Sequence, residues 1–201
     1  MNPPWNASAP PARCLRAWMW KRLDVEGSEY CELLATGAGH VLAGAVTLAL
    51  EGVPCFVEYS VEVDAGWRTR AARVELRRGG EQRSLGLRVD EDQRWWHGAE
   101  EVTAFRGCVD VDLGFTPSTN TLPIRRLALA EGQSAPATAA WVRMPDLALL
   151  PLPQRYTRLG ASRYRYESTT GSGFEAELDV DELGLVLRYP PAWERVADTG
   201  R

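Results

Sequence analysis

The chain has 201 residues, of which 45% are hydrophobic and 25% are charged, values typical of a soluble globular protein and not of a disordered or fibrous one. That length is enough for one domain or at most two. Lys and Arg total 23 against 27 for Asp and Glu, which gives a net charge of −4. This balance disfavours nucleic-acid binding, because a protein that binds the phosphate backbone needs a basic surface.

The N-terminal residues are rich in Pro and Ala and lack the apolar core of a secretory signal peptide. We expect a flexible arm over residues 1–14, followed by a single domain over residues 15–197. The most apolar run, residues 38–50, is shorter than the about 20 residues that a membrane-spanning helix needs. These features predict a cytoplasmic protein without a transmembrane segment.

Apolar and polar residues alternate along several short runs in the rest of the chain. Strict alternation is typical of antiparallel strands with one face on the core and the other in water. Gly79-Gly80 separates two of the runs, as expected for a β-hairpin. Such strands at spacings of about ten residues, with no long helical pattern between them, predict a mainly β protein with a curved sheet, an open barrel or a sandwich. The alternating runs are residues 57–64, 73–77, 84–90, 109–115 and 174–180.

One segment, TPSTNTLPIRRLAL from Thr116 onward, interrupts the alternation. Thr121 precedes Leu122-Pro123, a pattern that resembles a helix N-cap with proline in the first turn. We therefore predict one short helix over residues 122–127. A single helix beside a strongly curved antiparallel sheet would plug or cover its concave face.

Residues that could carry catalysis or bind metal are few. The chain has two histidines and four cysteines without a CxxC pair, and Asp110 with Asp112 offers too few oxygens for a hard cation. A polar outer strand face is the simplest interpretation of these two aspartates. A Ser-His-Asp triad can be drawn from Ser118, His97 and Asp112, but no nucleophile elbow is present. Gly-rich phosphate loops are also absent, so we expect no metal and no cofactor.

Aromatic residues are more informative, since the chain has eight tryptophans. Trp95 and Trp96 are adjacent and must face opposite ways in a strand, whereas Tyr164 and Tyr166 share a face. Two interpretations stay open. The aromatic side chains fill a β core, or they line a pocket for lipid chains or sugar faces, with Arg at its rim for anionic head groups.

Several stretches carry a family resemblance. RWWHG from Arg94 and GCVDVDLGFTPSTNTLPIRRL from Gly107 resemble the bacterial putative glycolipid-binding family, and short matches near residues 142–145, 154–156 and 164–166 continue the similarity. The resemblance implies a single-domain β half-barrel, or pseudo-barrel, similar in shape to the periplasmic carriers that shield lipoprotein acyl chains. It also implies binding of a lipid or glycolipid in the concave face. Unlike those carriers, the chain shows no signal peptide, which argues against a periplasmic shuttle.

We therefore predict a non-enzymatic protein that binds a lipid or glycolipid. The expected ligand-binding residues lie in or beside the segments that carry the resemblance and have aromatic, basic or polar side chains. They are Trp95, Trp96, His97, Asp112, Thr116, Asn120, Thr121, Arg125, Arg126, Arg143, Tyr156 and Tyr164.

Two alternatives remain open, an enzyme that acts on a small or sugar-bearing substrate through His97, Asp112 and Arg125, and a domain that binds another protein. Arg125 and Arg126 point about 100° apart in a helix, so we expect only one of them to face a groove. The alternative for such an Arg is to anchor the helix to a sheet carboxylate, such as Asp110 or Asp112.

Overall fold

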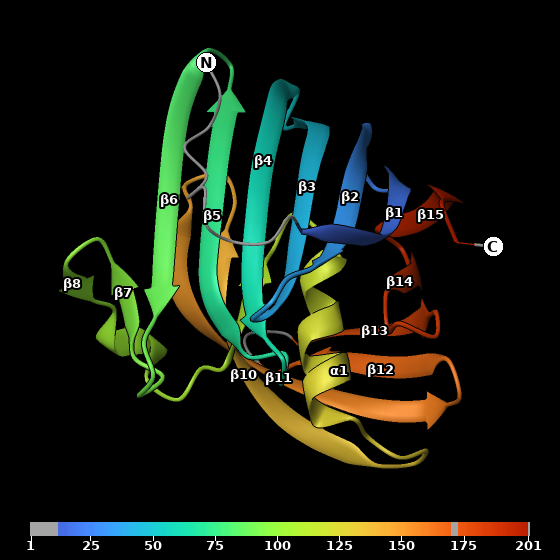
Figure 1. Cartoon of the computed structure of the whole chain (residues 1–201). Helices are drawn as coiled ribbons and strands as arrows, with labels where there is room; N and C mark the ends of the chain where they lie inside the picture. The colour runs from blue at the N-terminus through green and yellow to red at the C-terminus, as the bar shows by residue number, and fades with distance from the viewer. Residues whose placement is uncertain (1–11, 170–172, 201) are drawn as a thin grey trace.

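The computed structural model describes residues 12–169 and 173–200, and within them a single 15-stranded sheet forms the fold (Figure 1). The strands, in chain order, are β1 (Arg13–Arg22), β2 (Gly27–Ala35), β3 (Gly39–Leu50), β4 (Val53–Asp64), β5 (Thr69–Arg78), β6 (Glu81–Val89), β7 (Trp95–His97), β8 (Glu100–Glu101), β9 (Asp110–Leu113), β10 (Ser134–Arg143), β11 (Ala148–Gly160), β12 (Arg163–Ser168), β13 (Phe174–Val180), β14 (Val186–Tyr189) and β15 (Trp193–Asp198). The short helices are η1 (Thr103–Phe105), η2 (Ser118–Asn120) and α1 (Thr121–Leu127).

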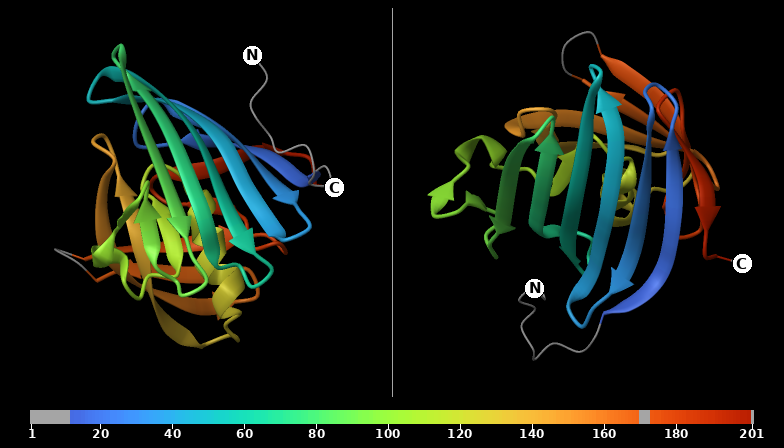
Figure 2. Two further views of the ribbon diagram at one scale, coloured as in Figure 1. Left: turned by 60° about the vertical axis from the view of Figure 1, so that its left-hand side comes forward. Right: turned by 90° about the horizontal axis from the view of Figure 1, so that it is seen from above.

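The first and last strands of the chain are neighbours in the sheet. β1 pairs with β2 on one side and with β15 on the other, so β8 to β1 make one wall and β15 to β9 make the second. Irregular register in β1, β4–β5, β11 and β13 accompanies the curvature, as β-bulges bend and twist the strands that contain them. The walls curve toward each other without closing, which confirms the predicted mainly β half-barrel (Figure 2).

Most of the predicted strands are present. The runs at 57–64, 73–77 and 174–180 lie in β4, β5 and β13, and the run at 84–90 lies in β6 except for its last residue. Gly79-Gly80 forms the β5–β6 turn with φ angles of 55° and 93°, which glycine adopts at little cost. β1 begins at Arg13, inside the predicted arm. Residues 1–11 of that arm lie outside the described residues, so the arm remains a prediction.

The prediction for residues 109–115 is wrong in three respects, namely the length, the direction and the burial of the strand. β9 covers only Asp110–Leu113, and it pairs with β10 in parallel, because the chain crosses through η2 and α1 before it reaches β10. Its polar residues do not form an outer face, since Asp110 is buried and Asp112 is half-buried. β9 is the last strand of the sheet, beside β10, and three of its four residues are buried.

Residues 110–127, called here the inner segment, fill the concave face of the sheet. Figure 2 shows α1 end-on between the two walls, and the first four residues of α1 are buried. The helix starts at Thr121, one residue before the predicted 122–127. The predicted N-cap is wrong, because Asn120 in η2 is already helical and leads directly into α1. No helix among the described residues is long and apolar enough to cross a membrane.

A buried ion pair ties the end of α1 to β9. Nε and one terminal nitrogen of Arg126 donate to the two carboxylate oxygens of Asp110 at 2.9 and 2.5 Å. Asp110 is 1% exposed, and burial raises its pKa while the hydrogen bonds from Arg126 oppose that rise. Arg126 therefore has the contacts expected of an anchor for the helix. Arg125 is exposed, with its guanidinium 5.3 Å from the centre of the Trp67 ring.

We predict that Arg126→Met destabilises the fold by about 3–5 kcal/mol, because it leaves the Asp110 carboxylate buried without a partner. Asp110→Asn in the same chain should restore much of this loss, since it removes the uncompensated charge. Arg125→Met is the control and should cost under about 1 kcal/mol. Urea unfolding followed by circular dichroism measures all three variants. Equal unfolding midpoints for Arg126→Met and wild type would show that the ion pair does not hold the inner segment.

Candidate functional site

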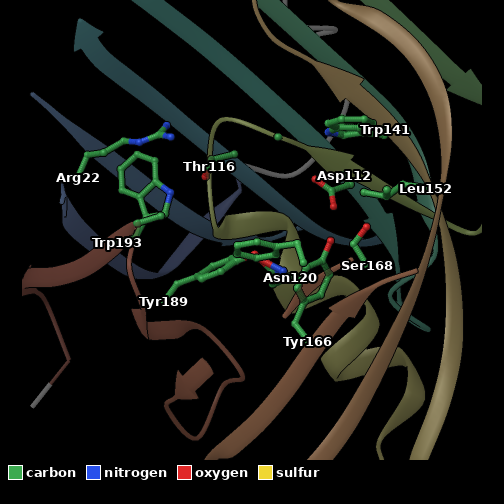
Figure 3. Close-up of a pocket in the computed structure, with 13 residues that line it drawn as sticks. Arg22, Asp112, Thr116, Asn120, Trp141, Leu152, Tyr166, Ser168, Tyr189 and Trp193 are labelled. Carbon is green, nitrogen blue, oxygen red and sulfur yellow. The ribbon is translucent and has the colours of Figure 1, made fainter. Parts of the chain in front are cut away.

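A cavity of about 320 Å³ lies between the inner segment and the strands of the second wall (Figure 3). The inner segment contributes Asp112, Thr116 and Asn120 to its lining. The other side chains come from β1 and from β10 to β15, which are far apart in sequence and meet because the sheet curves. The main ones are Arg22, Trp141, Leu152, Tyr166, Ser168, Phe174, Tyr189 and Trp193.

Trp141 of β10 lies at the boundary between this cavity and a neighbouring groove. A Cβ atom on Gly114 would lie 2.6 Å from the indole nitrogen of Trp141, so the indole packs directly over the backbone of residue 114. Only glycine permits this close approach. The position of the Trp141 side chain thus depends on the lack of a side chain at residue 114.

The neighbouring groove has a volume of about 260 Å³ and shares Arg22, Gly114 and Trp141 with the cavity. Most of its other side chains are apolar, and Arg143 and Glu51 are its charged members besides Arg22. The apolar lining residues are Leu48, Leu50, Phe115, Met144 and Pro145. The cavity and the groove therefore meet at Trp141, and both have polar and apolar side chains in their lining.

Asp112 is the acidic residue of the cavity. Gln154, which is 4% exposed, donates from Nε2 to Oδ2 of Asp112 at 2.5 Å and to the Tyr166 hydroxyl at 3.2 Å. Burial raises the pKa of Asp112 to about 6, and the nearby Asp110 adds to the rise. The carboxyl is therefore mostly ionised at neutral pH.

Arg22 lies at the opposite end of the cavity from Asp112 in Figure 3. Its guanidinium donates to the two oxygens of Asp24 at 2.7 and 3.1 Å and lies 4.8 Å from the centre of the Trp193 ring. Asp24 neutralises this cation, so the Arg22 end of the cavity carries little net charge.

Aromatic rings cover one side of the cavity. Tyr166, Phe174 and Tyr189 are mutually tilted, with ring centroids 6.1 to 6.2 Å apart. Tyr156 packs edge-on against Tyr166 and accepts a hydrogen bond from Asn120 Nδ2 at 3.0 Å. The rings come from four different strands, β11 to β14, and together they give the cavity an aromatic wall.

A second buried acid, Glu29 of β2, lies behind Thr116. The hydroxyls of Thr116, at 2.7 Å, and Tyr59 both donate to Glu29 Oε1, whereas Oε2 has no hydrogen-bond partner among the described residues. Burial raises the pKa of Glu29 to about 8, which the two hydroxyl donors oppose. Glu29 is therefore mostly protonated at neutral pH, and it accepts the hydrogen bond that orients the Thr116 side chain.

The model of the family described as "Putative glycolipid-binding" matches residues 17–195. The chain belongs to this family. A crystal structure of a DUF1089 family protein from Pseudomonas aeruginosa is 33% identical to it and covers 98% of this chain and 99% of its own, with a TM-score of 0.76. No curated protein matches the chain. The family resemblance carried by the motifs from Arg94 and Gly107 is thereby confirmed.

Three of the residues predicted to bind ligand in this glycolipid-binding family member line the cavity, namely Asp112, Thr116 and Asn120. Arg143 lines the neighbouring groove, and Tyr156 lies directly behind Asn120. These five come from the inner segment, β10 and β11. Their role in binding stays a prediction.

The other predicted residues lie outside the cavity lining. Trp95 is buried against Phe105 and donates to the Cys108 carbonyl, whereas Trp96 faces the other way and donates to Asp90. His97 is exposed at the end of β7.

The remaining residues that were predicted to bind ligand lie in the inner segment and in β12. Thr121 is buried in α1, Arg125 lies over Trp67 and Arg126 is paired with Asp110. Tyr164 is covered by the guanidinium of Arg158. Of His97, Asp112 and Arg125, the set drawn for an enzyme, only Asp112 lines the cavity.

Sequence reasoning missed Arg22, Trp141, Phe174, Tyr189 and Trp193 as lining residues. No local motif connects them, because they lie on five strands whose neighbours are set by the curvature of the sheet. The high tryptophan count was the available signal, and it indicated an aromatic pocket without identifying its members. Glu29 also escaped notice, since a single Glu in an alternating strand looks solvent-exposed.

We predict that Glu29 makes the stability of the fold depend on pH. The folded protein keeps the Glu29 proton up to about pH 8, whereas an ordinary Glu releases it near pH 4.5. The contribution of the neutral acid is therefore complete below about pH 4.5 and is lost as the pH rises through 8, by up to about 1.4 kcal/mol per pH unit. The side chain introduced by Glu29→Gln cannot ionise. The free energy of unfolding of this variant, relative to that of wild type, should therefore rise between pH 5 and pH 8.

Urea unfolding at pH 5, 6.5 and 8 measures this difference, with Glu62→Gln on the exposed face of β4 as the matched control. The control should follow wild type at every pH. A constant difference between Glu29→Gln and wild type across the three pH values would mean that Glu29 titrates as an ordinary acid.

Proposed function

We propose that this protein binds a glycolipid, with the glycosyl head group in the cavity beside Asp112 and the first part of the apolar chain in the neighbouring groove. The observation that carries the proposal is that a cavity lined by a carboxylate, an amide and aromatic rings meets, at Trp141, a groove whose lining includes Leu48, Leu50, Phe115, Met144 and Pro145. An amphiphile has the same two parts joined at one point.

The size of the cavity fits a head group better than a whole lipid. Its volume of about 320 Å³ is at the lower end of the roughly 300–1,000 Å³ typical of ligand pockets. An acyl chain therefore needs the adjoining groove. There, each methylene removed from water contributes about 0.8 kcal/mol, which makes even a short buried chain useful for affinity.

The chemistry of the cavity also fits a sugar. A pyranose ring carries C–H groups on its faces and hydroxyls around its edge. The tilted rings of Tyr166, Phe174 and Tyr189 offer apolar surface to the faces. The Asp112 carboxylate and the Asn120 side chain offer hydrogen-bonding atoms to the hydroxyls. The family description, which names glycolipid binding, supports the same ligand class.

We predict that octyl β-D-glucopyranoside binds at concentrations below those at which it forms micelles. Its affinity should exceed that of methyl β-D-glucopyranoside, which has the head group alone, and that of 1-octanol, which has the chain alone, by at least about tenfold. Isothermal titration calorimetry measures the three ligands. An affinity for octyl glucoside equal to that for octanol would rule out a role for the head group.

Gly114→Ala tests whether binding occurs where the cavity and the groove meet. The added Cβ would displace the Trp141 indole, so the affinity for octyl glucoside should fall about tenfold or more. Gly86→Ala in β6 is the matched control, because a Cβ there has no atom within 4 Å. If both variants bind octyl glucoside like wild type while remaining folded by circular dichroism, the ligand does not occupy this site.

A further inference from the structure

We propose that the head group bound in this cavity carries a positive charge, an ammonium group on or beside the sugar ring, which Asp112 binds. The inference rests on the proposed function, because it specifies the chemistry of the ligand at the same site.

Asp112 has no cationic partner among the described residues. Its hydrogen-bond donor is the neutral side-chain amide of Gln154. Arg126, the partly buried cation of the inner segment, donates from Nε and one terminal nitrogen to the two carboxylate oxygens of Asp110. A partly buried carboxylate without a counter-charge is costly unless something pairs with it. The cavity is the space from which that partner can come.

The groups that face Asp112 carry no positive charge either. Tyr156 of β11, Tyr166 of β12 and Tyr189 of β14 all interact with its charge, and Asp110 is the nearby acid on its own strand. Burial raises the pKa of each of the three tyrosines, and the Asp112 charge adds to the rise. The tyrosines therefore stay protonated and neutral and give Asp112 no counter-charge.

The aromatic wall adds a second attraction for a cation. An ammonium group is attracted to the face of an aromatic ring within about 6 Å of its centre, and the attraction is stronger where water is excluded. Tyr166 and Tyr189 meet at 6.2 Å between centroids, and both line the same cavity as Asp112 (Figure 3). A carboxylate beside several aromatic rings is the combination that recognises an ammonium group and repels an anion.

The two ends of the cavity differ in what they offer a cation. At the far end Arg22 and Asp24 neutralise each other, so the acid without a cationic partner is at the Asp112 end. Trp141 is directly opposite Asp112 in the β9–β10 pairing, and it borders the apolar groove. A ligand with its ammonium on Asp112 can thus send its chain past Trp141 into that groove.

The test compares three ligands that differ only at the second carbon of the sugar. They are octyl β-D-glucopyranoside, its 2-amino-2-deoxy analogue and the 2-acetamido analogue, in which the charge is removed. Calorimetry at pH 7 and 0.15 M salt limits the effect of distant surface charges, because the screening length is then about 8 Å. We expect the amino compound to bind at least about tenfold more tightly than either neutral compound.

Asp112→Asn keeps an oxygen that can accept from Gln154 but removes the charge. In this variant the affinity ratio between the amino compound and octyl glucoside should fall to near one, whatever the absolute affinities. Asp92→Asn, an exposed acid in the turn before β7, is the matched control and should keep the wild-type ratio.

Each other result contradicts a specific claim. Equal binding of the charged and neutral compounds to wild type would overturn the ammonium inference and leave the proposed glycolipid function intact. A preference for the amino compound that survives Asp112→Asn would show that Asp112 is not its partner. No binding of any of the three compounds would overturn the proposed function itself.

Discussion

A sheet that curves without closing leaves an apolar concave face that has to be covered, and in this protein residues 110–127 cover it. That segment is not purely apolar, since it brings Asp110, Asp112, Thr116 and Asn120 into the interior together with its hydrophobic residues. Each of these polar groups needs a partner there, because an unpaired buried polar group costs roughly 1–3 kcal/mol. The partners come from the walls and from α1, and they determine how the segment is held and where the cavity forms.

The hydrogen-bond partners of these polar side chains differ between the residues that only hold the inner segment in place and those that also line the cavity. Asp110 is satisfied by Arg126, and Thr116 is satisfied by Glu29 on the first wall. Near the second wall, Asn120 and Asp112 meet neutral partners in Tyr156 and Gln154, and both also border the cavity. The β1–β15 pairing sets Arg22 opposite Trp193 and so completes the far end of the same space. The curvature that requires an inner segment thus also assembles the site.

The sequence predicted the features that depend on local pattern. Alternation identified β4, β5, β6 and β13, Gly79-Gly80 identified a hairpin, and Pro123 helped to place the helix. The direction and burial of β9 could not be found in this way, because Asp110 and Asp112 alternate with apolar residues as the outer face of any strand does. Only the crossover through α1 makes β9 parallel and internal. The aromatic wall was likewise hidden, since Tyr166, Phe174 and Tyr189 become neighbours through the order of β12, β13 and β14.

Asp110 and Asp112 lie two residues apart on one short strand, yet they have opposite electrostatic environments. Asp110 has a bidentate cation and is nearly inaccessible, as a structural ion pair requires. Asp112 has an amide donor, an acidic neighbour and tyrosines around it, and an asparagine could accept the same hydrogen bond from Gln154 without the cost of a buried charge. The fold alone therefore gives no reason for a carboxylate at residue 112. A ligand that supplies the missing positive charge gives one, and it accounts for the presence of a charged acid among the residues of the inner segment that line the cavity.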